Sequence, residues 1–349
     1  MSAMSSPSSA ALAAHAVSAS RRAGFGLSLV PQERLAEAVR RDAGRLLFAV
    51  RYGAPRAALT IDPIPVLDVP NRVLGSGPSI ELWHSPEPVR VWRTGRFVCA
   101  ESSTAMFGAA LCRLADDLEA ETVALYRELL ELLTQSGSSS LQRLWNYLPE
   151  INGDQRGVER YKRFSAGRAR AFEGVFGIPA ERHFPASSAI GTTGDTLVVA
   201  FLAARESGRH VENPRQVSAF RYPPQYGEKS PSFARGTLSP AALGHAFLLS
   251  GTASVVGHES RHEGDVLRQL QETLQNIETL SAAVGLVSER SALDVARFDY
   301  VKTYLRRSTD FPAVRDALVP RLGPAASTIW LEADICRAEL LLEIEGIAL

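Results

Sequence analysis

The chain has 349 residues with 38 basic and 38 acidic side chains, is 45% hydrophobic and contains three cysteines. This length allows about two domains with cores of their own, and the balanced charge argues against a nucleic-acid binder, which usually carries a basic patch. The lack of an apolar run of about 18 residues excludes a transmembrane helix, and few, scattered cysteines favour a reduced, cytoplasmic protein. An anionic ligand must be held by locally focused charge, because the whole molecule offers no attraction.

The first 22 residues are rich in Ser and Ala, contain no acidic residue and end at Arg21 and Arg22. This composition predicts a disordered tail over 1–22, with an organelle transit peptide as the alternative. Regular apolar patterns begin after it.

The predicted elements follow one order twice: strand, helix, strand, helix, strand. The first copy has strands at 95–100, 144–148 and 196–203, with helices around 125–133 and 168–176. The second has strands at 244–251, 300–305 and 340–348, with helices at 266–284 and 312–318. Gly137 and Gly285 are expected to end the first helix of each copy, because glycine commonly follows the last helical residue.

A matched junction supports the duplication: residues 185–190 read Pro-Ala-Ser-Ser-Ala-Ile and residues 324–329 read Pro-Ala-Ala-Ser-Thr-Ile. The repeated order predicts the α/β (α+β) class, with two tandem modules that are each a mixed β-sheet with helices packed on one face. The predicted division is an N-terminal module over 23–204 that includes an extra N-terminal segment, a linker over 205–240 and a catalytic C-terminal module over 241–349. The linker is rich in Pro, Gly, Tyr and Arg, so we expect it to contribute to the active site.

The last strand carries acidic residues inside an apolar run, Leu-Leu-Leu-Glu-Ile-Glu over 340–345. Strand alternation places Glu343 and Glu345 on one face and their aliphatic neighbours on the other. The matching strand of the first copy has no carboxylate, so we expect a single active site in or beside the second module. The alternative is a solvent-facing glutamate on an edge strand.

The second copy resembles the RidA/YjgF family of small trimeric proteins, through Phe-Leu-Leu-Ser-Gly at 247–251, Gln-Glu-Thr-Leu-Gln-Asn-Ile at 271–277 and the final strand. That family's arginine in the Pro-Ala-Arg-Ser segment is replaced here by Ala326, which argues against ordinary imine-deaminase chemistry. The segments at 160–164, 221–227, 230–235 and 336–345 then make residues 90–349 similar to the chorismatases, which resemble two fused RidA-like modules. The resemblance implies a monomer or pseudo-trimer, with the segment 205–240 shaping its third side.

The chorismatase resemblance implies cleavage of chorismate, a dianion with an enolpyruvyl ether, with release of pyruvate and without metal or organic cofactor. Its hard step is protonation of the enol-ether methylene, which needs a buried carboxylic acid, and Glu343 is the implied donor. Arg168 and Arg235 are expected to hold the two carboxylates, with Tyr161 and Tyr222 as hydrogen-bond donors or walls. Arg306 is a weaker candidate.

Two pocket positions indicate the product. Gly251 and Cys336 resemble the chorismatases that form 3-hydroxybenzoate, whereas the hydrolytic ones tend to have alanine at the first position. The implied reaction is therefore cleavage of chorismate to 3-hydroxybenzoate and pyruvate. The alternatives are the hydrolytic reaction, which yields a dihydroxycyclohexadiene carboxylate and pyruvate, and a non-catalytic RidA-like binding protein. Cys336 could also be only a small buried hydrophobe.

One motif suggests another class. Residues 258–262 read His-Glu-Ser-Arg-His, which satisfies the H-E-x-x-H pattern of zinc peptidases. The pattern requires a helix, so that both imidazoles lie on one face around zinc. Gly257 and Gly264 flank it closely, so we expect a loop whose histidines make local hydrogen bonds, and no metal site.

Overall fold

The described residues form three large mixed β-sheets and two short hairpins. The computed structural model describes residues 25–138, 140–288 and 297–349, so the predicted tail over 1–22 lies outside the described residues. The first sheet has the strand order β1-β5-β2-β4-β3 and carries one helix. Its elements are β1 (Gly26–Val30), α1 (Leu35–Arg41), β2 (Leu46–Tyr52), β3 (Ala58–Ile61), β4 (Pro65–Val69) and β5 (Ile80–His84).

The second sheet has the order β12-β9-β13-β8-β7-β6. Its elements are β6 (Arg90–Thr94), β7 (Phe97–Glu101), β8 (Ala105–Arg113), α2 (Leu118–Ser136), β9 (Ser140–Pro149), α3 (Arg160–Phe176), β12 (Ala186–Thr192) and β13 (Thr196–Ala204). A short hairpin of β10 (Asp154–Gln155) and β11 (Val158–Glu159) precedes α3. Helix α2 begins where the Asp117 carboxylate accepts a hydrogen bond from the Ala120 amide, and it ends at Gly137 in the left-handed region, as predicted.

The third sheet has the order β14-β15-β16-β21-β19-β20. Its elements are β14 (Arg209–Val211), β15 (Gly236–Leu238), β16 (Phe247–Thr252), α4 (Val266–Ser288), β19 (Tyr300–Leu305), α5 (Phe311–Leu318), β20 (Ser327–Glu332) and β21 (Leu342–Ala348). The second hairpin pairs β17 (Val255–Val256) with β18 (Glu259–Ser260). None of the helices described is long and apolar enough to cross a membrane.

The second and third sheets share one connectivity. In each, a strand leads through a helix to a second strand, which pairs in parallel with a third: β9 with β12, and β19 with β20. The last strand then inserts antiparallel between the first two: β13 between β8 and β9, and β21 between β16 and β19. The predicted class, two tandem modules with mixed sheets and helices on one face, is confirmed.

Two predicted details are wrong. The counterpart of β16 in the first copy is β8, whereas the predicted strand at 95–100 is β7, the hairpin partner of β8. Helix α4 continues past Gly285 to Ser288. One glycine inside a helix costs only about 1 kcal/mol relative to alanine, and the buried Leu280 and Val284 hold this part of the helix against the sheet.

The first sheet repeats the same connectivity without its second helix. Strand β5 inserts antiparallel between β1 and β2, and β2 pairs in parallel with β4. The short strand β3 stands where the other copies have a helix. Residues 26–84 therefore form the third side that was expected from the segment 205–240, and that segment instead adds β14 and β15 to the third sheet.

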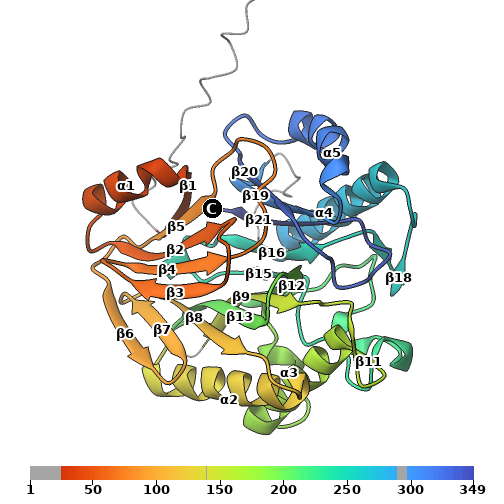
Figure 1. The fold of residues 1–349 in the computed structure, drawn as a ribbon, viewed down its shortest axis with the longest axis horizontal. Helices are drawn as coiled ribbons and strands as arrows, with labels where there is room; N and C mark the ends of the chain where they lie inside the picture. The colour runs from red at the N-terminus through yellow and green to blue at the C-terminus, as the bar shows by residue number, and fades with distance from the viewer. Residues whose placement is uncertain (1–24, 139, 289–296) are drawn as a thin grey trace, which may run out of the picture.

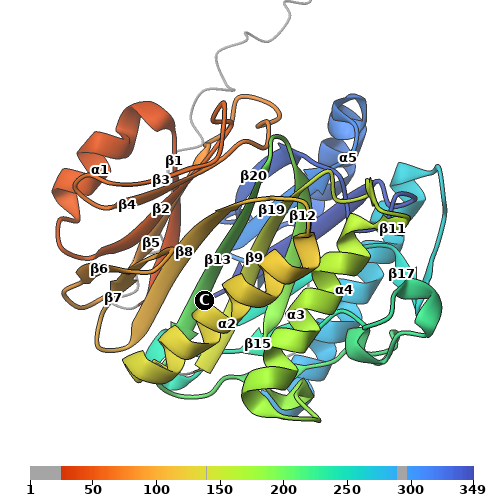
Figure 2. The ribbon, with the colours of Figure 1, turned by 60° about the horizontal axis from the view of Figure 1, so that its bottom comes forward.

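The three sheets face one another around a shared centre, and the helices lie on the outside (Figures 1 and 2). One apolar cluster draws on all three sheets and includes Trp83, Tyr147 and Leu248. Separate clusters fill the space behind each sheet, under α2 and α3, under α4 and α5, and under α1. Side chains on the inner faces therefore meet residues from distant parts of the chain.

Equivalent register positions meet at this centre. One buried tyrosine comes from each sheet: Tyr52, Tyr147 and Tyr304. The Oη atoms of Tyr52 and Tyr147 lie 3.0 Å apart. By the same register, Glu345 on β21 corresponds to Glu81 on β5 and to Ala200 on β13. Two of the three copies thus place a carboxylate at the centre.

Candidate active site

A cavity of about 430 Å³ opens between the second and third sheets. Its walls are α3 with the hairpin before it, the segment 216–235, strands β16 and β21, and the loop that precedes β21. Six of the seven predicted site residues line it: Tyr161, Tyr222, Arg235, Gly251, Cys336 and Glu343. Tyr226 lines it as well. The fold therefore brings together residues that are almost 200 positions apart.

Glu343 enters the cavity from β21. Its aliphatic neighbours pack into the core under α4, so Glu343 and Glu345 share the opposite face, as predicted. This face of the central strand β21 is turned toward the second sheet, since Glu345 on it bonds Arg143 and Trp145 of β9, and Glu343 is 4% exposed. Burial and then the charge of Glu345 raise the pKa of Glu343 to about 8, against the lowering effects of Arg143 and Arg235. No described residue donates a hydrogen bond to this carboxyl, which is largely protonated at neutral pH.

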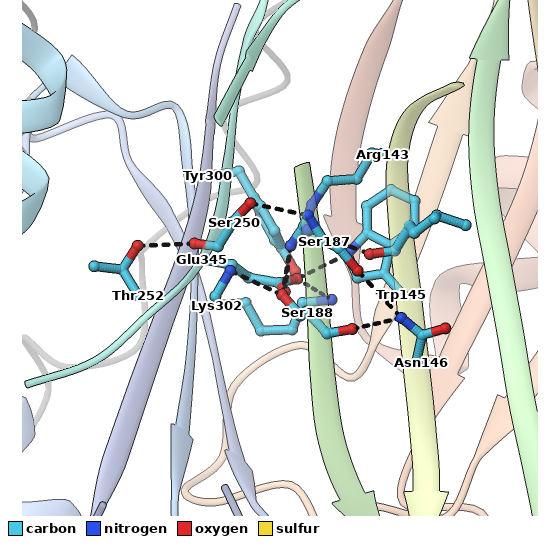
Figure 3. A network of polar contacts seen from close by, with 12 residues as sticks. Arg143, Trp145, Asn146, Ser187, Ser188, Ser250, Thr252, Tyr300, Lys302 and Glu345 are labelled. Carbon is cyan, nitrogen blue, oxygen red and sulfur yellow. Dashed lines mark hydrogen bonds and ion pairs between the residues drawn. The ribbon is translucent and has the colours of Figure 1, made fainter. Parts of the chain in front are cut away.

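Glu345 has the opposite environment (Figure 3). Four donors surround its carboxylate: Ser188 Oγ at 2.5 Å, Arg143 Nη2 and Lys302 Nζ at 2.8 Å, and Trp145 Nε1 at 3.0 Å. Burial raises the pKa of Glu345, but Lys302 and Arg143 more than offset this, so that the pKa is lowered overall. Two glutamates on one strand face are thus held in different protonation states.

Gly251 lies directly against the Glu343 carboxyl. A Cβ at this position would come within 2.6 Å of Glu343 Cδ and 3.0 Å of Ser188 Oγ. The Gly251 amide also donates to Ser188 Oγ at 3.0 Å. Glycine is therefore required for the observed placement of the acid. Ser188, which the sequence prediction omitted, lies in the matched junction at 185–190.

Arg235 is held in a fixed orientation beside the cavity. Its Nη2 donates to Tyr222 Oη at 2.7 Å and to the Val217 carbonyl at 2.8 Å, and its guanidinium lies 5.1 Å from the centre of the Phe233 ring. Its Nε is buried and has no hydrogen-bond partner. A buried donor without a partner is costly, so this N–H group is available to an anionic ligand.

Arg337 is a further cation in the cavity wall, in addition to Arg235 and Lys162, and sequence reasoning missed it. Its guanidinium lies 4.2 Å from the Tyr226 ring centre and donates to the His258 carbonyl at 2.9 Å and to Ser260 Oγ at 3.1 Å. The available signal was its place directly after Cys336, in a segment already assigned to the pocket.

Arg168 does not line the cavity. It lies on the same face of α3 as Tyr161, two turns or about 10 Å further along the helix. There it is 2% exposed, donates to Ser187 Oγ at 3.1 Å and lies 5.6 Å from the Phe164 ring centre. Its Nε has no partner, and among the described residues no carboxylate lies within ion-pair distance of it. Arg306, the weaker candidate, is engaged by Asp334 at 2.5 Å.

Cys336 and Tyr161 face the cavity as neutral groups. Burial, with the charge of Glu343, raises the pKa of the Cys336 thiol to about 12, and burial also raises the pKa of the Tyr161 hydroxyl. Cys336 packs against both the central apolar cluster and the cluster under α2. An uncharged thiol is a weak nucleophile, so Cys336 contributes volume and shape to the cavity.

The H-E-x-x-H pattern does not form a zinc-peptidase helix. Glu259 and Ser260 form strand β18, and His262 has a left-handed backbone with φ of 59°. His258 contacts Tyr226 Oη at 3.3 Å and His262 contacts Glu272 at 3.3 Å. The expected local hydrogen bonds are confirmed, and within the described part of the chain no group of three or more His, Cys, Asp or Glu side chains could hold a metal ion.

Residues 81–203 match the family model described as Chorismatase FkbO/Hyg5-like, N-terminal. A 3-hydroxybenzoate synthase from Streptomyces hygroscopicus is 41% identical over 238 residues, which cover 65% of this chain and 69% of that protein. A chorismatase from Streptomyces rapamycinicus is 36% identical over 273 residues, 76% of this chain and 81% of that protein. The crystal structure of a chorismatase, 29% identical, superimposes with a TM-score of 0.84 over 93% of this chain and 98% of that one.

Proposed function

Because this chain belongs to the chorismatase family, we propose that it cleaves chorismate to 3-hydroxybenzoate and pyruvate in the cavity between the second and third sheets. The observation that carries the site assignment is the carboxyl of Glu343, which is buried, protonated near neutral pH and faces the same cavity as Arg235. An acid beside a cation suits a dianionic substrate that must be protonated.

Glu343 is the proposed general acid. Its proton goes to the methylene carbon of the enolpyruvyl group, which becomes an oxocarbenium-like centre. The oxygen of the hydroxyl on the adjacent ring carbon then forms a bond to the ether-bearing carbon, as the bond between that carbon and the ether oxygen breaks and pyruvate leaves. The bond from the hydroxyl oxygen to its original carbon opens, a hydride moves to that carbon, and the ring loses a proton as it becomes aromatic with its hydroxyl at the former ether position. The two products together contain the atoms of chorismate, so the reaction consumes no water, and the ring proton can replace the one that Glu343 gave.

Arginine side chains are proposed to hold the two substrate carboxylates. Arg235 has a free, buried N–H group and is oriented by Tyr222, and its planar fork suits a carboxylate. Arg337 also lies in the cavity wall, where its guanidinium can pair with a carboxylate in the same way. Arg168 stays a candidate, because its buried guanidinium has an unused N–H group behind the wall formed by Tyr161. A buried cation without a carboxylate partner favours an anion nearby.

The product is assigned from Gly251 and Cys336, and the 41% identical relative is named 3-hydroxybenzoate synthase. The absence of a Cβ at Gly251 lets the Glu343 carboxyl lie against the β16 backbone. The alternative, hydrolytic cleavage, would add one water and yield a dihydroxycyclohexadiene carboxylate. We also propose a cytoplasmic location, which the three free cysteines support.

Glu343→Gln tests the assignment, since glutamine has the same shape and cannot supply an acidic proton. We expect pyruvate release to fall by about 100-fold to 10,000-fold, with an unchanged melting temperature. Mass analysis of the ring product from the wild-type protein is the companion measurement. Full turnover by Glu343→Gln would refute the proton-donor role, and a dihydrodiol product would refute the product assignment while leaving the enzyme class intact.

A further inference from the structure

The protonation state of Glu343 depends on its burial and on the charges of the neighbouring side chains, some of which are negative and some positive. Burial is the largest cause that raises its pKa, and the charge of Glu345 on the same strand raises it further, whereas Arg143 from β9 and Arg235 from the segment before β15 lower it. Tyr161 from α3 and Cys336 from the loop before β21 face it as neutral groups. Glu345 is thus the one anion among these neighbours, and without it burial alone would oppose the two arginines.

The Ser188 hydroxyl donates a hydrogen bond to Glu345 and none to Glu343, although it lies near both carboxyl groups. A serine hydroxyl has one hydrogen to donate and two lone pairs to accept with. The hydrogen is directed to Glu345, at 2.5 Å, and the lone pairs accept from Arg143 Nη2 at 2.6 Å and from the Gly251 amide at 3.0 Å. The hydroxyl is therefore fully used and has no hydrogen left for Glu343, even though it lies beside Gly251, against which Glu343 rests.

The charge on Glu345 is fixed by contacts that reach all three sheets. Lys302 on β19 bonds Glu345 at 2.8 Å and Glu81 on β5 at 2.6 Å, and Arg143 comes from β9. Burial lowers the pKa of Lys302, but its two carboxylate partners more than offset this and raise it overall. Glu345 thus remains a carboxylate in an interior where a lone anion would be costly.

We propose that Glu345 is a positioning residue for the reaction, acting through its charge to keep Glu343 in the protonated form that the proposed function requires. It touches no part of the cavity that would receive substrate, since it does not line the cavity wall. Its effect is electrostatic, because a like charge two residues away on one strand face disfavours ionisation of the acid.

The rate of pyruvate release as a function of pH, in wild type, Glu345→Gln and Glu81→Gln, tests this role. Glu81 is the matched control, because it is an equally buried carboxylate on the same Lys302 and does not contribute to the pKa of Glu343. In Glu345→Gln the alkaline decline should move down by about one pH unit or more, so that the rate near pH 8 falls about fivefold or more relative to the rate near pH 6. In Glu81→Gln the decline should stay where it is.

The proposal is overturned if the rate of pyruvate release declines at the same pH in wild type and Glu345→Gln. It is also overturned if Glu81→Gln lowers the pH of this decline as much as Glu345→Gln does. If Glu345→Gln does not fold, the double variant Glu345→Gln with Lys302→Met removes one charge of each sign, so that the remaining charges of Glu81 and Arg143 still balance at the centre. The same displacement is expected there, and its absence overturns the proposal. The proposed function fails separately, if wild type releases no pyruvate or if Glu343→Gln is fully active.

Discussion

Substitution of Gly251 by alanine should displace the catalytic acid. The added Cβ would lie 2.6 Å from Glu343 Cδ, whereas carbon atoms in contact are about 3.5 Å apart. The carboxyl must then retreat by about 1 Å, and a misplacement of this size can cost about 100-fold in rate. We therefore expect Gly251→Ala to lower pyruvate release by about that factor and to raise the share of the dihydrodiol, because the new methyl group alters where water and the ring can lie.

The assay is pyruvate release together with separation of the ring products by mass. Gly153→Ala is the control, since Gly153 also lines the cavity but the atoms nearest to its added Cβ belong to Glu150 and Arg160, with the Glu150 carbonyl at 3.0 Å, and not to Glu343. This variant should keep the wild-type product ratio. Wild-type rate and product ratio in Gly251→Ala would show that Glu343 does not depend on the missing side chain.

Two further outcomes are expected. Pyruvate release by the wild-type protein should be constant below the pKa of Glu343 and fall as pH rises through about 8, because only the protonated form can donate; a rate that rises through this range would contradict general-acid catalysis by this residue. Arg235→Lys should raise KM by about tenfold or more with a smaller effect on kcat, since an ammonium cannot pair bidentately with a carboxylate, and unchanged steady-state constants would remove Arg235 from the substrate-binding set.

Much of the two later modules could be predicted from the sequence, because their helices are long and their strands are bounded by clear turns. Strand alternation alone predicted that Glu343 and Glu345 share one face of their strand, and the structure adds that β21 is a central strand of its sheet. Arg337 was missed because it lies in an irregular loop, where no periodicity indicates which way a side chain points. The contacts of Glu345 with Arg143 could not be foreseen, since they join residues about 200 positions apart across a packed interface.

The sheet over residues 26–84 was also missed, for a physical reason. The repeat was detected through long amphipathic helices and through the junction at 185–190, and neither has a counterpart there. Helix α1 has only seven residues, and β3 replaces the second helix. Strand β2 is a nearly continuous apolar run, which is typical of a strand buried on both faces and carries no period-two signal.

The three copies carry different residues at equivalent positions at the centre, such as Glu81, Ala200 and Glu345, and this distinguishes the chain from a symmetric trimer. In a three-fold assembly of identical chains, every residue near the axis occurs three times, so charge there comes only in multiples of three. Here two carboxylates, Glu81 and Glu345, meet one ammonium and one guanidinium, Lys302 and Arg143, and the formal charges cancel. Three identical chains cannot place two carboxylates beside one ammonium and one guanidinium, whereas copies joined in one chain can, because each can change alone. For the same reason, the interface between the second and third sheets can contain a cavity with an acid, Glu343, while the other two interfaces need not carry one.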